Sequence, residues 1–487
     1  MSDSKKVRVR FAPSPTGFLH VGGLRTALYN FLFARKNNGL FVLRIEDTDR
    51  TRYVEGAVEN LIDTLHWAGL EYDEGPHTGG PYGPYIQSER LEIYKNHTEQ
   101  LLANGKAYRC FCTTERLEKV RKEREQKKLP PKYDRFCLRL SHHQVEENLQ
   151  KGIPFVVRMK VLDNTMIRFH DVIREDVEFA SEQLDDQVLL KSDGYPTYHL
   201  ANVVDDHLMQ ISHVIRGEEW LSSTPKHVLL YQSFGWEMPV FAHLPLLLNP
   251  DRSKLSKRQG DVAVEDYRAK GYLKEALINF VALLGWNPGT EQEFFYLNEL
   301  VEQFSLEGVN KSGAIFNIEK LNWLNFEHLR KRPVNEVLEI LKEELKKSRF
   351  KDMRFSDDYL IKVIEAMRER VSFVREFIEK SPYFFEAPNT YDEHVVKKHW
   401  KSYSADYLRN YSTEILKLTN ASKEDFEKAL HETAKSLNVG NGILIHATRL
   451  AVSGVGAGPG LFDILFILGK DECVKRINTA IEKIKPA

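Results

Sequence analysis

The feature that most constrains the fold lies in residues 7–45, where the apolar pattern changes from alternation to helical spacing and back. Residues 7–11 alternate apolar and charged side chains, as a strand does. A turn rich in proline and glycine follows at residues 13–17, and apolar side chains then repeat at helical spacing over residues 24–32. Residues 40–45 form a short run typical of a buried strand. This βαβ pattern predicts an α/β fold with a parallel sheet of the nucleotide-binding type.

Three further regions follow and differ in charge and periodicity. Residues 106–135 contain 11 Lys/Arg and 5 Asp/Glu, so the local charge is 11 − 5 = +6. Residues 188–217 return to a strand-like pattern, in which the run Val-Val-Asp-Asp at 203–206 is expected to end a strand. Beyond Asn322, Leu, Lys and Glu repeat at helical spacing. We therefore expect one parallel sheet interrupted by an insertion of about 80 residues, and then an all-α last third.

Composition limits the class of protein. The 487 residues correspond to roughly three domains. A hydrophobic fraction of 42% with 29% charged residues excludes wholesale disorder and collagen-like repeats. The apolar run at 276–286 is too short for a bilayer, which needs ~20 residues, and residues 1–11 lack the apolar core of a signal peptide.

Four cysteines indicate a reducing, intracellular compartment. Since the net charge is −1, nucleic-acid affinity would have to come from local patches.

Two short motifs have the composition of a phosphate-binding site. His20 and two glycines, Gly22 and Gly23, stand where the first helix is expected to begin, and the N–H groups of a helix start can bind an anion. Residues 254–258 read Lys-Leu-Ser-Lys-Arg in a turn-rich loop, and such cations can stabilise charge that develops in phosphoryl chemistry. Taken alone, each motif is more often a glycine-rich turn or a solvated basic loop.

The two motifs indicate a particular protein family when their order and the segments around them are considered together. HVGG at 20–23 followed by KLSKR at 254–258 resembles the signature pair of class I aminoacyl-tRNA synthetases. Four further segments, at residues 10–17, 43–50, 192–206 and 214–220, resemble the glutamyl-tRNA synthetase family in its bacterial form. The resemblance is specific from residue 7 to residue 269, and it continues more diffusely to the C-terminus, including residues 458–465.

The resemblance implies a Rossmann-type parallel-sheet catalytic domain with an inserted acceptor-binding subdomain, plus an all-α C-terminal anticodon-binding region. On this basis we expect the halves of the catalytic domain at 1–105 and 188–250, the acceptor-arm-binding insertion at 106–187, a stem-contact region with the lysine loop at 251–322, and the anticodon-binding region at 323–487.

The resemblance also implies a reaction. In that family the α-carboxylate of glutamate attacks the α-phosphorus of ATP, and the glutamyl-adenylate then acylates the terminal ribose of tRNA, releasing AMP. Mg²⁺ would neutralise the ATP phosphates, and no covalent protein nucleophile is needed. The implied catalytic residues are His20, Lys254 and Lys257, of which Lys257 would stabilise the pentacovalent phosphorus. The implied ATP-binding residues are Pro13, Gly22, Gly23, Glu219, Leu247 and Lys257.

A glutamate pocket needs donors for two carboxylates and an acceptor for one ammonium group. Arginine suits the carboxylates because its planar guanidinium binds them in bidentate fashion. Arg10 and Arg216 fall on family positions for the substrate carboxylates, with Arg216 assigned to the side chain, and Glu46 would accept from the ammonium group. The remaining wall of the pocket would be Ser14, Tyr198, Asn202 and Trp220.

Three of the four cysteines have the spacing of a zinc site. Cys110, Cys112 and Cys137 resemble the zinc module of some bacterial members, but Arg139 stands where a histidine ligand is usual. Structural zinc needs four ligands, and arginine stays protonated. Tyr133 matches a rarer arrangement, His142 and His143 are further options, and a zinc-free insertion with reduced thiols is the alternative.

The expected macromolecular partner is tRNA(Glu). The basic stretch at 119–128 would face the acceptor arm, and Arg370 aligns with a family position that reads an anticodon base. Three alternatives share parts of this pattern: a glutaminyl-tRNA synthetase with C-terminal β-barrels, a truncated enzyme without an anticodon-binding domain, and a non-catalytic tRNA-binding relative. We expect a cytoplasmic monomer with no membrane association, and leave open whether it charges one tRNA or two.

Overall fold

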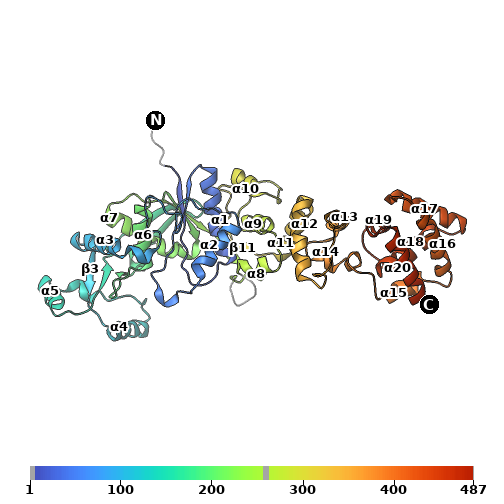
Figure 1. Ribbon diagram of the computed structural model, residues 1–487. Coiled ribbons are helices and arrows are strands. Elements are labelled where there is room, and N and C mark those ends of the chain that lie inside the picture. The colour runs from blue at the N-terminus through green and yellow to red at the C-terminus, as the bar shows by residue number, and fades with distance from the viewer. Residues whose placement is uncertain (1–5, 256–262, 486–487) are drawn as a thin grey trace. The chain divides into compact units, whose positions relative to one another are not determined.

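The computed structural model describes residues 6–255 and 263–485, which form two compact units (Figure 1). The first contains the described residues up to Lys270 together with Lys274–Lys320, and mixes helices with strands. The second contains Gly271–Leu273 and the described residues from Leu321 onward. Within these described ranges, no helix is both long enough and apolar enough to span a bilayer.

The first unit begins with the βαβ unit that the sequence predicts. Strand β1 (Arg8–Phe11) pairs in parallel with β2 (Leu40–Leu43), and helix α1 (Val21–Lys36) connects them. The return to β2 passes through Gly39, where a Cβ would stand 2.5 Å from the carbonyl oxygen of Val7, so only glycine fits without a shift. The helical spacing of apolar residues 24–32 predicted this helix correctly.

A second set of strands places side chains from distant parts of the sequence at one sheet edge. The four-stranded sheet has the order β6 (Glu175–Ala180), β5 (Met166–Asp171), β9 (Val240–Leu244) and β8 (His213–Gly217). Strands β5, β9 and β8 run parallel to each other, with Arg216 of β8 opposite His243 of β9. The amide of Ser212 donates to the carbonyl of Arg8 at 2.9 Å, which joins the start of β8 to β1.

The structure corrects one sequence expectation in this region. The Val-Val-Asp-Asp run at 203–206 does not end a strand, because it lies within helix α6 (Tyr198–Leu208). Seven residues of α6 are buried, including both Asp205 and Asp206, so the helix has no long polar face. A short helix that is buried on most sides has a nearly continuous apolar sequence. The spacing of apolar residues cannot distinguish such a helix from a buried strand.

The region expected as an insertion shares strands with its surroundings. Strands β3 (Ala107–Cys110), β4 (Val156–Met159) and β7 (Val188–Leu190) form an antiparallel sheet, so β7, at the expected start of the second half, pairs with β4. Strand β5 pairs with β9 outside the expected insertion. The domain limits within the chain stay a prediction.

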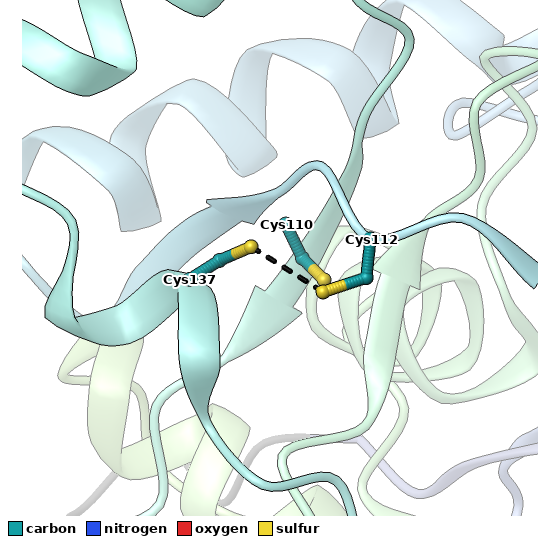
Figure 2. Close-up of side chains that lie close together, drawn as sticks. All are labelled: Cys110, Cys112 and Cys137. Carbon is teal, nitrogen blue, oxygen red and sulfur yellow. Dashed lines mark hydrogen bonds between the residues drawn. The ribbon is translucent and has the colours of Figure 1, made fainter. Parts of the chain in front are cut away.

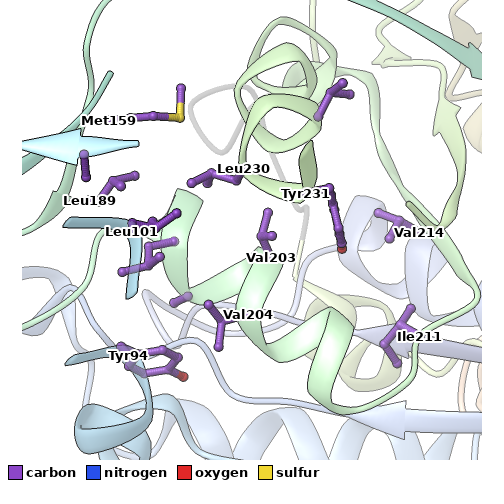
Figure 3. Packing of buried hydrophobic residues seen from close by; sticks show 14 of the residues in the cluster. Tyr94, Leu101, Met159, Leu189, Val203, Val204, Ile211, Val214, Leu230 and Tyr231 are labelled. Carbon is purple, nitrogen blue, oxygen red and sulfur yellow. The ribbon is translucent and has the colours of Figure 1, made fainter. Parts of the chain in front are cut away.

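A continuous apolar core joins these sheets to the helices around them (Figure 3). Tyr94 and Leu101 of α3 (Leu91–Ala103), Val203 and Val204 of α6, and Tyr231 of α7 (Thr224–Phe234) are buried in it. Further helices of the first unit are α2 (Ala57–Trp67), α4 (Thr114–Gln126), α5 (His142–Gln150), α8 (Val264–Ala269), α9 (Lys274–Ala282) and α10 (Leu297–Gln303). Two short strands, β10 (Leu247–Leu248) and β11 (Ala314–Ile315), pair in parallel.

The second unit has no strand among its described residues 321–485, which confirms the expected helical last third. Its longer helices are α11 (Ile318–Lys331, which starts in the first unit), α12 (Val334–Lys347), α13 (Asp357–Met367), α16 (Ser404–Lys417), α17 (Lys423–Ser436), α18 (Asn441–Ser453), α19 (Leu461–Leu468) and α20 (Lys470–Lys483). The shorter ones are α14 (Glu376–Glu379) and α15 (Glu393–His399). Ser356 and Ser422 cap the starts of α13 and α17 with their hydroxyl groups.

Candidate active site

A cavity of about 550 Å³ opens between the start of α1, the ends of β1 and β8, and helix α6. Every described residue that the sequence predicts for ATP or glutamate lines it: Arg10, Pro13, Ser14, His20, Gly22, Gly23, Glu46, Tyr198, Asn202, Arg216, Glu219, Trp220, Leu247 and Lys254. Lys257 lies outside the described residues. The cavity therefore brings together residues that are up to about 240 positions apart in the sequence.

His20 caps the helix that borders this cavity. Its Nδ1 accepts from the N–H of Gly23 at 3.0 Å, so in the neutral ring the proton belongs on Nε2. A Cβ at Gly23 would lie 2.7 Å from a methyl carbon of Leu19, so the Leu19 side chain would have to shift to admit a larger residue. The Gly23 amide is thus engaged by His20, and the ring itself presents the donor.

Buried charges on one wall form a connected network. Arg10 donates from Nε and Nη2 to the carboxylate of Asp206 at 3.0 and 3.3 Å. Arg44, which is fully buried, donates to Asp206 at 2.8 Å and to Glu46 at 2.9 Å. Asn202 donates to the same oxygen of Glu46 at 3.3 Å. The network fixes the Glu46 carboxylate at the cavity wall.

The pKa values of the two acids in this network, Asp206 and Glu46, shift in opposite directions. Burial opposes the charge of Asp206, but Arg10 and Arg44 outweigh it, and the pKa of Asp206 is lowered. Burial raises the pKa of Glu46, although Arg44 and Arg10 favour its ionised form. A cation placed beside Glu46 would therefore relieve the cost of burying its charge.

Arg216, at the opposite wall, is surrounded by neutral groups. Its Nη1 donates to the hydroxyl of Tyr198 at 2.9 Å, its Nη2 to Thr224 at 2.9 Å, and its Nε to Nε2 of His243 at 3.1 Å. Nδ1 of His227 lies 3.3 Å from Nη1. Burial lowers the pKa of both histidines, that of His243 to about 4. Within residues 6–255 and 263–485, no carboxylate forms a salt bridge with this guanidinium, which is 5% exposed.

Aromatic rings and a further arginine complete the walls. The rings of Tyr198 and Trp220 lie 4.3 Å apart, between their centroids, and Trp220 stays partly exposed. Arg25 of α1 is buried and donates to the carbonyls of Leu284, at 3.0 Å, and Pro245. Lys254 is exposed and its backbone bridges to Leu248.

Sequence reasoning missed the residues that hold the predicted ones in place: Arg25, Arg44, Asp171, Asp206, Thr224, His227 and His243. Their partners lie far away in the sequence, as for Arg10 and Asp206, which are 196 residues apart. The one available signal was the pair of adjacent acids at 205–206, which the sequence placed at a strand end.

The cysteine cluster lies at the end of β3 and the short helix Phe136–Arg139 (Figure 2). The Sγ atoms of Cys110, Cys112 and Cys137 all lie within 4.8 Å of one another, and those of Cys112 and Cys137 are 3.5 Å apart. The hydroxyl of Tyr133 lies 3.4 Å from Cys110 Sγ and 3.3 Å from Cys112 Sγ. Among the described side chains, His142 and His143 are not part of the cluster.

The residues expected to contact tRNA lie in both units. Helix α4 of the first unit, which carries most of the basic stretch, has no buried residue. Arg370 of the second unit lies in a short helical turn, Arg368–Arg370, and is exposed, while its carbonyl accepts from Nζ of Lys380 at 3.3 Å.

Two family models match the chain in succession. The model of the catalytic domain of class I tRNA synthetases (E and Q) matches residues 6–323, and an anticodon-binding-domain model matches residues 332–481. The chain is a class I tRNA synthetase by its fold and by the cavity described above.

Individual relatives show to which family of class I tRNA synthetases the chain belongs. A glutamate–tRNA ligase of Chloroherpeton thalassium is 55% identical over 493 residues, covering 98% of each chain, and one of Chlorobaculum parvum is 52% identical over 495 residues, covering 99% of this chain and 98% of its own. The crystal structure of a glutamate tRNA ligase from Elizabethkingia meningosepticum, in complex with its amino acid, matches with a TM-score of 0.94 at 41% identity, over 99% of this chain and 100% of that one. The chain belongs to the glutamate–tRNA ligase family.

Proposed function

We propose that this chain joins L-glutamate to tRNA(Glu) with ATP, through a glutamyl-adenylate, and releases AMP and pyrophosphate. The observation that carries the proposal is Arg216, a buried cation whose described side-chain partners are all neutral. A buried charge without an ion-pair partner is costly, and a ligand carboxylate beside it would compensate it. Family membership supports the same substrate.

Glutamate would lie between Arg216 and the charged network on the opposite wall. Arg216 would bind the side-chain carboxylate, and Glu46 would accept from the ammonium group. Arg10 uses Nε and Nη2 on Asp206, which leaves Nη1 for the α-carboxylate. Ser14, Tyr198, Asn202 and Trp220 would enclose the carbon chain. This pose directs the α-carboxylate towards the start of α1.

ATP would occupy the part of the cavity that borders α1 and β10. The Nε2–H of His20 would donate to the phosphates, near the positive end of the α1 dipole. Leu247 would present backbone groups to adenine, Glu219 would lie near the ribose, and Pro13, Gly22 and Gly23 would line the nucleotide. With Lys254 and Lys257 stabilising charge on the phosphorus, the reaction needs positioning and charge stabilisation only.

Mg²⁺ would neutralise the phosphate oxygens of ATP and favour the departure of pyrophosphate. The chain's own contribution is to hold the carboxylate of glutamate in line with the α-phosphorus and to keep the buried charges in fixed positions. The acylation of tRNA then requires only that the terminal ribose enters the same cavity.

For tRNA we propose two contact regions. The exposed side chains of α4 would bind acceptor-arm phosphates, whose contacts dominate nucleic-acid affinity. Arg370 would read an anticodon base with its guanidinium. We further propose that the enzyme acts in the cytoplasm, where its substrates are, and that it acts as a monomer.

We also propose a structural zinc ion bound by Cys110, Cys112, Cys137 and Tyr133. A Zn–S bond of about 2.3 Å gives a tetrahedron whose corners are about 3.8 Å apart. The 3.5 Å between the sulfurs of Cys112 and Cys137, and the 3.3 Å from the Tyr133 oxygen to Cys112, are close to such an arrangement. Such an ion would fix the loop after β3 to the helical turn that carries Cys137.

The direct test is aminoacylation with labelled glutamate on purified glutamate-specific and glutamine-specific tRNAs, with labelled glutamine as the control amino acid. If glutamate, and not glutamine, is charged, and only onto the glutamate-specific tRNA, the result supports the proposal and the role of Arg370. Charging of both tRNAs keeps the chemistry and removes the anticodon claim. Charging by glutamine, or of neither tRNA, contradicts the proposed function.

A further inference from the structure

A buried aspartate–histidine pair lies directly behind Arg216. Asp171 ends β5, His243 lies in β9 and Arg216 lies in β8, and these three parallel strands are neighbours in one sheet. Oδ2 of Asp171 lies 2.6 Å from Nδ1 of His243, and Nε2 of His243 lies 3.1 Å from Nε of Arg216. Asp171 and His243 are fully buried and neither lines the cavity.

The chemistry of the chain Asp171–His243–Arg216 allows one arrangement of protons. The Nε of arginine can only donate, so Nε2 of His243 must accept. The proton of the neutral ring therefore lies on Nδ1, which donates to Asp171. Asp171 can only accept, because its Oδ1 also faces the amides of Ile173 and Arg174, at 3.0 and 2.8 Å. Each member fixes the protonation of the next.

We propose that Asp171 and His243 form a positioning pair that holds the guanidinium of Arg216 in the orientation needed for glutamate. His243 takes the inner Nε–H, while Nη1 donates to Tyr198, which lines the cavity, and Nη2 donates to the buried Thr224. The imidazole ring of His243 separates the carboxylate of Asp171 from the guanidinium of Arg216. It thus supports Arg216 without forming the salt bridge that would compete with a substrate carboxylate.

This inference rests on the proposed function, and the test separates the two. In Asp171→Asn, the amide oxygen remains opposite the backbone N–H groups and the amide nitrogen faces Nδ1 of His243. The histidine must then accept at Nδ1 and carry its proton on Nε2, which points at the Nε–H of Arg216. Nε2 would then donate to the Thr224 hydroxyl oxygen, 3.1 Å away, and the Nε–H of Arg216 would lose its acceptor, so the guanidinium would move.

The measurement is the KM of glutamate and of ATP in aminoacylation of tRNA(Glu). We expect Asp171→Asn to raise the glutamate KM roughly tenfold to a hundredfold, as for a lost hydrogen bond to a charged group, with the ATP KM unchanged. Asp186→Asn is the control for the loss of a buried carboxylate charge, because Asp186 is also buried and accepts from the backbone amide of Val161, at 3.1 Å, and from Arg135 and Tyr108, none of which lines the cavity. It should leave the glutamate KM unchanged.

A second pair of variants covers the case in which Asp171→Asn does not fold. The amide of a glutamine can reach the position of Nε2, whereas that of an asparagine reaches only the position of Nδ1. His243→Gln should therefore keep the acceptor for Arg216 and a near-normal glutamate KM. His243→Asn should lose the acceptor and show a raised glutamate KM.

The outcomes are decisive. An unchanged glutamate KM in Asp171→Asn, equal increases for glutamate and ATP, or equal effects of His243→Gln and His243→Asn would each show a merely structural pair and overturn the inference. Absence of glutamate charging by the unmodified chain would instead contradict the proposed function.

Discussion

At Arg216, the contacts keep a guanidinium charged in the interior while leaving it without an acidic partner. Tyr198, Thr224, His227 and His243 all face it as neutral groups. Their dipoles stabilise the cation only in part, so in the proposed pose a bound carboxylate would supply further stabilisation. Specificity for a charged side chain would follow, because an amide would leave this buried charge uncompensated.

The first prediction concerns this residue. Arg216→Gln should raise the KM of glutamate roughly a hundredfold, since it removes the proposed charged contact with the substrate carboxylate, and should leave the KM of ATP nearly unchanged. Steady-state aminoacylation with each substrate varied in turn measures both. Equal damage to ATP use would count against the role of Arg216 in the amino-acid pocket.

The second prediction concerns Arg44, which contacts both Asp206 and Glu46. Arg44→Met should lower the free energy of unfolding of the first unit by about 3–5 kcal/mol, because two buried carboxylates lose a shared cation. Urea denaturation followed by circular dichroism measures it. The control is Arg168→Met, which breaks an exposed pair with Glu178 and should have almost no effect. Equal stability of both variants would contradict a structural role for the buried network.

At the scale of elements, α1 combines a structural cap with the proposed phosphate contact in one side chain. Nδ1 of His20 caps the helix, and Nε2 carries the donor. His20→Asn keeps a good N-cap but loses the donor, whereas His20→Ala loses both. We expect both variants to lose most of their ATP-dependent activity, and only the alanine variant to lose about 1 kcal/mol of stability. Thermal unfolding and pyrophosphate exchange in the presence of tRNA test this, and an active His20→Asn would refute the phosphate contact.

The zinc module is a second element-level prediction. The purified chain should contain one zinc ion, measured by elemental analysis, and Cys112→Ser and Tyr133→Phe should lower that content because each removes a proposed ligand. Cys473→Ala is the control, because this cysteine is buried in α20, far along the sequence from the module. A zinc-free unmodified chain, or full zinc content in Cys112→Ser, would contradict the site.

How far the sequence could predict these elements depends on where their information lies. The βαβ unit and the helical last third were predictable, since alternation and helical spacing are local signals. Helix α6 was not, because burial of both its apolar residues and its acids removed the polar face that marks a helix. The cavity residues came from motifs that resemble a family, but the partners that orient them, such as His243 and Asp206, are set by sheet register and by contacts across about 200 residues.

At the scale of the whole molecule, buried neutral histidines make stability depend on pH. Burial lowers the pKa of His199 to about 3 and that of His243 to about 4, below the value of about 6.5 in an unfolded chain. Between pH 6.5 and 4 the unfolded state therefore binds more protons, and stability falls by about 1.4 kcal/mol per pH unit for each such histidine. The lowered pKa values of Asp171 and Asp206 add a further loss at still lower pH.

We therefore expect the first unit to melt at a clearly lower temperature at pH 5.0 than at pH 7.5. Differential scanning calorimetry, which can resolve transitions of separate units, measures this. His328, buried in α11 with a pKa lowered to about 4, should give the second unit a dependence of the same sign. A melting temperature that stays constant or rises towards pH 5.0 would contradict the buried neutral histidines.

The distance in sequence between Arg10 and Asp206 has a consequence during synthesis on the ribosome. Arg10 and Arg44 are made early, but the acid that they share follows 196 residues after Arg10. At about 5–20 residues per second, this delay lasts roughly 10–40 s. Throughout that interval Arg44 can pair with Glu46, but Arg10 lacks the acid that it contacts in the folded chain, so its burial in the final core would be unfavourable. The proposed amino-acid pocket is thus completed late, only after α6 has left the ribosome.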